Sequence, residues 1–192
     1  MIGRPIEFDR DIALEAAMRT FCRQGYEATS LLDLLAAMDL SKSSLYQSFG
    51  DKQALYHACL ERYCGHFMHA LEDALASHDT AMAALEQVLM AVAEEAADPA
   101  PLGCLLHNSI NEFGRRDPAM TAAIQDRITR LRATLVKAIR RAQRERGIDP
   151  ARSPQDLADF LIAGISGLRS MVKAGLSVKQ TRGIARHLLA SL

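Results

Sequence analysis

The most constraining feature of this sequence is the stretch 25–57, GYEATSLLDLLAAMDLSKSSLYQSFGDKQALYH, in which helix start and stop signals follow one another closely. Gly25 suits the left-handed position that ends a helix. Ser30, with Asp33 three residues later, has the pattern of a capping box, so a new helix is expected to begin there. Its leucines then give this helix one apolar stripe. The stretch therefore predicts a short helix, a turn and a second short helix that runs into a third.

The second short helix, residues 41–49, has an unusual distribution of side chains. Ser41 caps it, and only Leu45 and Phe49 are available for burial. Its other side chains are small or form hydrogen bonds, which suits a helix that lies in the major groove of DNA. The alternative is an ordinary corner of two packed helices, which does not require Lys, Tyr and Gln to face outward. Asp51 caps the long helix that follows.

This part of the chain resembles the DNA-binding domain of the TetR family of transcriptional repressors. The matching residues are GRP at 3–5, FDRDIAL at 8–14, Phe21, GYEATS at 25–30, Ala36 and SKSSLYQSFGDKQAL at 41–55. The remaining chain matches the family in length and helical character. The resemblance implies a helix-turn-helix domain over residues 1–52 and an effector-sensing and dimerisation domain over residues 53–192.

Composition favours an all-α fold, and the resemblance implies that it consists of an N-terminal helix-turn-helix three-helix domain and a C-terminal helical ligand-binding and dimerisation domain. Hydrophobic residues make up 49% of the 192 residues, Ala and Leu are abundant, and runs of β-branched residues are rare. No apolar run approaches the ~20 residues needed to cross a bilayer. The N-terminus does not resemble a signal peptide, so we expect a cytoplasmic protein with no membrane partner.

The net charge is zero, but the charges are unevenly distributed. Residues 1–52 hold 6 Lys and Arg against 8 Asp and Glu, residues 53–114 hold 1 against 9, and residues 115–146 hold 10 against 3. DNA binding by such a domain must depend on a few placed cations and on helix N-termini directed at phosphates. We expect the basic segment to complement the acidic one, within the subunit or near the surface that faces DNA.

The resemblance implies that a homodimer reads a palindromic, double-stranded operator with the 41–49 helix. Base or nearby phosphate contacts are expected from Lys42, Ser43, Ser44 and Gln47, and phosphate contacts from Thr29, Tyr46 and Lys52. Arg4 belongs to an N-terminal arm that either enters a minor groove or is a disordered tail.

Two hydrophobic helices are expected at 154–174 and 177–191, and together they make half of a four-helix bundle. The resemblance implies that a second subunit supplies the other half, whereas internal packing in a monomer is the alternative. The expected interface residues are Leu161, Ile165, Leu168, Ile184 and Leu188.

The segment GCLLHNSINEFGRRDP, residues 103–118, resembles the central segment of a TetR-family branch that includes repressors sensing reactive electrophiles. Cys104 is expected in the first turn of a helix and near solvent, where the helix dipole favours a thiolate. The alternative is that Cys104 is a buried packing residue, and nothing in the sequence places Lys173 beside it. The other candidates for contact with an effector are His107, Asn108, Asn111, Phe113 and Met171.

Catalytic and metal-binding signatures are missing from the sequence. No Ser/His/Asp set, phosphate-binding Gly loop or HExxH motif occurs, and the four cysteines contain no CxxC pair. His66 and His69 lie three residues apart without a clear set of further ligands, so we expect no metal or other cofactor. The sequence thus predicts a repressor released from its operator by a small molecule or an electrophile. The alternatives are a helical adaptor and a small enzyme without a recognisable motif.

Overall fold

A computed structural model of the chain describes residues 8–114 and 116–192, which form helices and no strand, as the sequence predicts. The elements are α1 (Arg10–Gln24), α2 (Leu31–Met38), α3 (Lys42–Phe49), α4 (Lys52–Ser77), α5 (Ala81–Glu94), the 3-10 helix η1 (Glu95–Ala97), α6 (Leu105–Phe113), α7 (Pro118–Arg144), α8 (Pro154–Lys173) and α9 (Val178–Ala190). None of the helices in these ranges is long and apolar enough to cross a membrane.

The predicted starts of α2, α3 and α4 are confirmed by their cap hydrogen bonds. The Ser30 hydroxyl accepts from the backbone N–H of Asp33 at 3.1 Å, and the Asp33 carboxylate accepts from the N–H of Ser30 at 2.8 Å, which completes the capping box. Ser41 and Asp51 each accept from the N–H three residues further on. Local side-chain chemistry therefore determines where these three helices begin.

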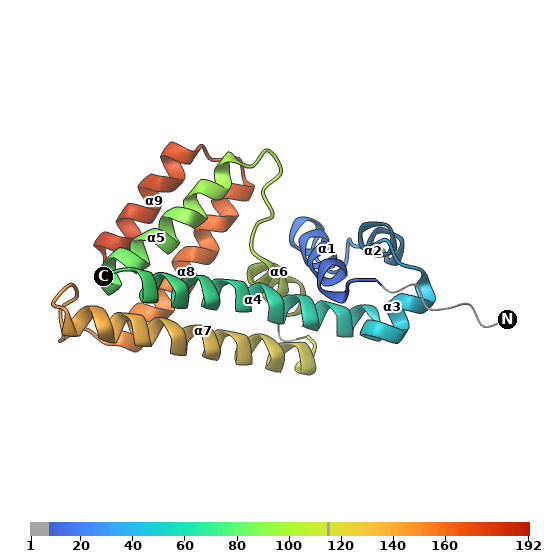
Figure 1. The fold of residues 1–192 in the computed structure, drawn as a ribbon, viewed down its shortest axis with the longest axis horizontal. Helices are drawn as coiled ribbons and strands as arrows, with labels where there is room; N and C mark the ends of the chain where they lie inside the picture. Colours follow the sequence, from blue (N-terminus) through green and yellow to red (C-terminus); the bar gives the residue numbers. More distant parts are fainter. Residues whose placement is uncertain (1–7, 115) are drawn as a thin grey trace.

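The long helices α4 and α7 lie side by side and run along most of the molecule (Figure 1). α1, α2 and α3 gather at one end of this pair, and α5, α8 and α9 gather at the other. α6 lies between the two groups, in contact with α1, α4 and α7. The arrangement places a small N-terminal group of helices, α1 to α3, on a larger helical body that comprises α4 to α9.

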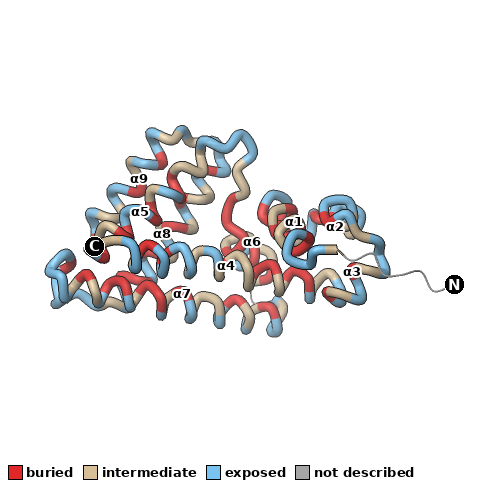
Figure 2. The backbone as a smooth tube through the Cα atoms, viewed as in Figure 1, coloured by how far each residue is buried: buried red, intermediate tan, exposed pale blue. Residues whose placement is uncertain are grey.

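Two clusters of buried side chains hold these groups together, and both include residues of α4. Buried positions recur along α4 (Figure 2). The first cluster contains Phe21, Tyr26, Tyr56 and Phe113, whose rings pack with centroids 4.8 Å apart for Phe21 and Tyr56 and 4.9 Å for Tyr26 and Phe113. The DNA-binding part predicted to end at residue 52 therefore shares its core with α4 and α6. The second cluster joins the C-terminal part of α4 to α5, α7, α8 and α9.

The acidic and basic segments meet within the subunit, as expected. Glu61 of α4 pairs with Arg127 and, at 3.2 Å, with Arg130 of α7. Arg141 of α7 donates to the carbonyl oxygens of His78 and Asp79, each at 3.0 Å, just after α4 ends. The basic face of α7 is thus partly occupied by intramolecular contacts.

A buried hydrogen bond between α4 and α6 gives a test of this packing. Tyr56 is fully buried, and its hydroxyl lies 2.9 Å from the Ser109 hydroxyl. We expect Tyr56→Phe to lower the free energy of unfolding by about 1 kcal/mol, because one buried hydrogen bond is lost. Urea denaturation measures this change, with the exposed Tyr46→Phe as the control. Equal stabilities of the two variants would contradict the assignment.

Candidate functional site

α3 presents a polar surface because its two large apolar side chains, Leu45 and Phe49, are buried. The predicted contact residues on the exposed side are Lys42, Ser43, Tyr46 and Gln47. Ser44 is half-buried, and its hydroxyl lies 2.8 Å from the hydroxyl of Ser41 at the N-terminus of the helix. An eight-residue helix with this surface offers several hydrogen-bonding groups to one groove of DNA.

Two cations accompany this surface. The Lys52 ammonium, in the first turn of α4, lies 4.2 Å from the centroid of the Tyr26 ring. The Lys42 ammonium lies 5.9 Å from the centroid of the Tyr46 ring. Contact with an aromatic ring orients the side chains of Lys42 and Lys52 and leaves both ammonium groups charged. The N-terminus of α4 adds free backbone N–H groups, which favour phosphate.

Thr29 does not belong to this surface, contrary to the sequence-based prediction. Its side chain is fully buried, and its hydroxyl donates to the carbonyl oxygen of Gly25. The hydroxyl therefore stabilises the turn between α1 and α2 and has no access to a phosphate. Arg4, the other residue expected outside α3 and α4, lies outside the described residues.

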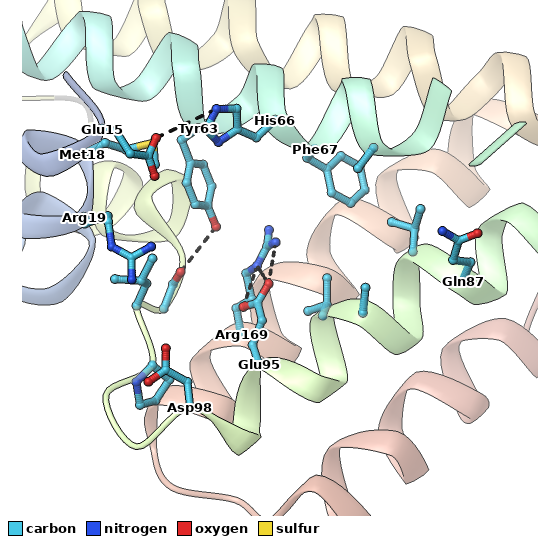
Figure 3. Close-up of a pocket in the computed structure, with 17 residues that line it drawn as sticks. Glu15, Met18, Arg19, Tyr63, His66, Phe67, Gln87, Glu95, Asp98 and Arg169 are labelled. Atoms are coloured by element: carbon cyan, nitrogen blue, oxygen red, sulfur yellow. Dashed lines mark hydrogen bonds and ion pairs between the residues drawn. The ribbon is translucent and has the colours of Figure 1, made fainter. Parts of the chain in front are cut away.

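A cavity of about 440 Å³ lies between the N-terminal helices and the helical body (Figure 3). Its lining is apolar on one part and charged on another. The lining residues are Glu15, Met18, Arg19, Tyr63, His66, Phe67, Ala70, Gln87, Val88, Ala91, Val92, Glu95, Asp98, Pro101, Leu102, Gly103 and Arg169. This volume falls in the range of small-molecule sites in proteins.

The polar part of the cavity is organised by Arg169 of α8. Its guanidinium donates to the carboxylate of Glu95 at 2.9 and 3.2 Å and lies 5.4 Å from the centroid of the Tyr63 ring. The Tyr63 hydroxyl donates to the carbonyl oxygen of Gly103 at 3.4 Å, and Tyr63 and Arg169 approach the same part of the cavity (Figure 3). Sequence reasoning missed these residues, although an arginine on the otherwise apolar face of α8 was a signal.

The effector candidates taken from the sequence do not line this cavity. Asn108 donates to the carbonyl oxygen of Cys22 at 3.2 Å, and Phe113 is buried in the aromatic cluster. Asn111 and Met171 are exposed, and His107 is half-buried. These five residues were predicted from their place in the chain, whereas the cavity is formed by residues that tertiary packing brings together.

Cys104 is the N-cap of α6, one position before the first turn in which it was expected. Its sulfur accepts from the N–H of His107 at 3.4 Å, and only 5% of the residue is exposed. The expectation of easy solvent access is therefore wrong. Cys104 and Cys64 instead line a second cavity of about 30 Å³, which shares Tyr63, Phe67 and Arg169 with the larger one.

The predicted dimer residues fall into two groups. Leu161, Ile165 and Leu168 are buried inside the subunit against neighbouring helices, so they are not available to a second subunit. Ile184 and Leu188 are half-buried and line an open groove together with Phe160, which is 41% exposed. The period of the apolar residues did not distinguish the inner face of α8 from its outer face.

Comparisons with known proteins agree with this geometry. Residues 13–59 match the family model described as bacterial regulatory proteins, tetR family, and residues 80–188 match that of the tetracyclin repressor-like C-terminal domain. The chain belongs to the TetR family. It is a DNA-binding transcriptional repressor by this membership, which excludes the enzyme and adaptor alternatives.

Individual relatives are similar over nearly the whole chain. The HTH-type transcriptional repressor ComR of Escherichia coli (strain K12) is 31% identical over 185 residues, which cover 95% of this chain and 88% of ComR. BdcR of the same organism, also an HTH-type transcriptional repressor, is 26% identical over 93% of this chain and 86% of its own. A cysteine-substituted mutant of the TetR-family regulator CifR, solved with 26-bp operator DNA, has a TM-score of 0.84 and 26% identity, covering 98% of this chain and 99% of its own.

The Tyr46 hydroxyl on α3 and the Lys52 ammonium on α4 give a test of the DNA surface. We expect Tyr46→Phe and Lys52→Ala to weaken binding to operator and to random DNA alike, by about 1 kcal/mol for each lost phosphate contact. Lys52→Ala should also reduce the slope of log affinity against log salt by about 1. Fluorescence anisotropy across a salt series measures both quantities. Unchanged affinity in a folded variant would remove that residue from the surface.

Proposed function

We propose that two copies of this chain bind one palindromic operator, each with α3 in a major groove, and thereby repress a nearby promoter in the cytoplasm. The observation that carries the proposal is the outward polar face of α3 beside the cation of Lys52. Membership of the TetR family and the likeness to operator-bound CifR support it.

A gel shift on the DNA upstream of the protein's own gene tests this function. We expect salt-sensitive, sequence-specific retention, with a footprint of two half-sites about one helical turn apart or a multiple of that distance. A shuffled fragment of the same composition is the control. Retention of neither fragment at low salt would contradict DNA binding, and equal retention of both would contradict operator recognition.

We further propose that the dimer forms through the outer faces of α8 and α9. Phe160 and Met171 are large apolar residues on α8 that are each 41% exposed, and Ile184 and Leu188 continue the apolar surface on α9. Small residues of α8 on the same side, such as Ala163 and Gly167, are exposed and permit close approach of a second helix. An obligate interface is expected to be apolar in this way.

Phe160→Glu tests this interface, because it places a carboxylate where a second subunit would exclude water. We expect sedimentation to give a dimer for the wild type and a folded monomer for the variant. Ile12→Glu, at an apolar residue that is 69% exposed on α1, is the matched control and should remain dimeric. A folded Phe160→Glu variant that stayed dimeric would place the contact elsewhere.

The signal that releases the operator is proposed to be a small molecule held in the 440 Å³ cavity. The cavity receives side chains from α1 and from the helical body, so a ligand there contacts both parts of the subunit. Phe67, Val88 and Val92 offer apolar contact, while Arg169 offers guanidinium hydrogen-bond donors. The ligand is therefore expected to be partly apolar with at least one oxygen acceptor.

We also propose that Cys104 senses a second releasing signal. The sequence predicts a reactive electrophile, and the structure favours a small oxidant among the reagents of this class. The cavity beside Cys104 is small, about 30 Å³, which favours a small oxidant such as a peroxide over a larger quinone. In the reaction the sulfur of Cys104 attacks a peroxide oxygen, the O–O bond breaks, water leaves, and the thiol becomes a sulfenic acid. Burial raises the pKa of the neighbouring Cys64 thiol to about 12, so little of Cys64 is present as the reactive thiolate.

Hydrogen peroxide and a quinone of similar reactivity distinguish these possibilities. We expect peroxide to release operator DNA from the wild type, while the quinone has little effect. A sulfenic-acid trap present while the oxidised protein is unfolded should label Cys104. Cys104→Ser should bind DNA normally and resist release, and Cys59→Ser, at a fully buried residue away from both cavities, should respond like the wild type. Equal release of Cys104→Ser and wild type would exclude Cys104 as the sensor.

A further inference from the structure

The C-terminal end of α1 is held by side chains that belong to the helical body. The Lys173 ammonium, at the end of α8, donates to the carbonyl oxygens of Cys22 at 3.2 Å and Arg23 at 2.9 Å. The Asn108 amide of α6 donates to the same Cys22 oxygen at 3.2 Å. Carbonyl groups in the last turn of a helix have no intrahelical partner, and the helix dipole favours a cation there. Side chains of the body therefore donate hydrogen bonds to carbonyl oxygens at the C-terminal end of α1.

The turn that follows α1 is held from the same side by a carboxylate. Glu112 of α6 accepts from the N–H of Tyr26 at 2.8 and 3.0 Å and from the N–H of Glu27 at 2.8 Å. Gly25, with φ +85°, allows this approach, since a Cβ there would lie 2.2 Å from a Glu112 carboxylate oxygen. Glu112 and Asn108 are four residues apart and so share one face of α6.

These contacts act where the orientation of the DNA-binding helices is determined. The turn held by Glu112 leads directly into α2 and α3, while α6 and α8 belong to the body (Figure 1). Charge-assisted hydrogen bonds are directional and stronger than neutral ones, so they resist tilting of α1 as well as its separation from the body. The buried aromatic cluster, by contrast, contributes mainly apolar burial between α1, α4 and α6.

We propose that Asn108, Glu112 and Lys173 are positioning residues that set the angle of the DNA-binding helices on the body, and hence the spacing of half-sites that the dimer accepts. This inference rests on the proposed function, because spacing is defined only for a dimer bound to two half-sites. Neighbouring base pairs lie about 3.4 Å apart, so a rigid dimer loses contacts when its half-sites are moved by one pair. A looser attachment lets each α3 follow its half-site.

The measurement is the affinity of the full-length protein for its operator and for operators with one base pair inserted or removed between the half-sites. We expect the wild type to prefer the natural spacing, and Glu112→Gln and Lys173→Met to reduce that preference by about fivefold or more. Lys173→Arg keeps a cationic donor and should retain most of the preference. Thermal denaturation of each variant checks that it is folded.

Two variants of the same chemistry serve as matched controls. Glu86→Gln on α5 and Lys179→Met on α9 change exposed residues whose side chains form no hydrogen bond or ion pair with α1 among the described residues. Both should discriminate spacing as the wild type does. Folded Glu112→Gln and Lys173→Met proteins with full discrimination would overturn the proposal, and so would an equal loss in the controls. A wild type that binds single half-sites without any spacing preference would instead overturn the proposed dimeric function.

Discussion

The structure depends on one helix, α4, which packs into both clusters of buried side chains. Its 26 residues span about 39 Å at 1.5 Å per residue. Leu55 and Tyr56 belong to the first cluster, whereas Leu71 and Ala74 belong to the second. Because one continuous helix connects the two clusters, the DNA-binding helices are joined to the body by more than a flexible linker. The same helix contributes Tyr63, His66 and Phe67 to the cavity and begins at Lys52.

The ion pairs between the acidic and basic segments contribute less to the stability of the fold than its apolar contacts do. The pairs between Glu61 of α4 and the arginines of α7 leave 46% of the Glu61 side chain exposed. Pairs of this kind contribute about 0–1 kcal/mol each, far less than the apolar contact along the two helices. Their effect is to select which surfaces meet. Many of the charges of α7 are thus committed to contacts within the subunit.

The cavity is lined by an ion pair and lies beside a residue that contacts α1. Arg169 is 15% exposed and is paired with Glu95, which offsets the cost of removing a charge from water. Lys173 follows Arg169 by one helical turn, and a Cβ at Gly103 would lie 2.7 Å from the Lys173 side chain. Gly103 itself lines the cavity. The wall of the cavity is thus in direct contact with a residue that holds the end of α1.

The sequence by itself determined the helical class, the starts of α2, α3 and α4, and the polar surface of α3. These depend on residues a few positions apart, such as Ser30 and Asp33, whose hydrogen bonds form within one turn. Membership of the TetR family was also readable from the motifs between residues 3 and 55. The tertiary structure alone decided that Thr29 is buried, that Leu161 and Leu168 face inward, and that Tyr63, Glu95 and Arg169 meet. Helical periodicity predicts which residues form an apolar face, but it does not identify the helix that covers this face. A cavity between helices has no local sequence pattern, because its lining residues come together only when the chain packs.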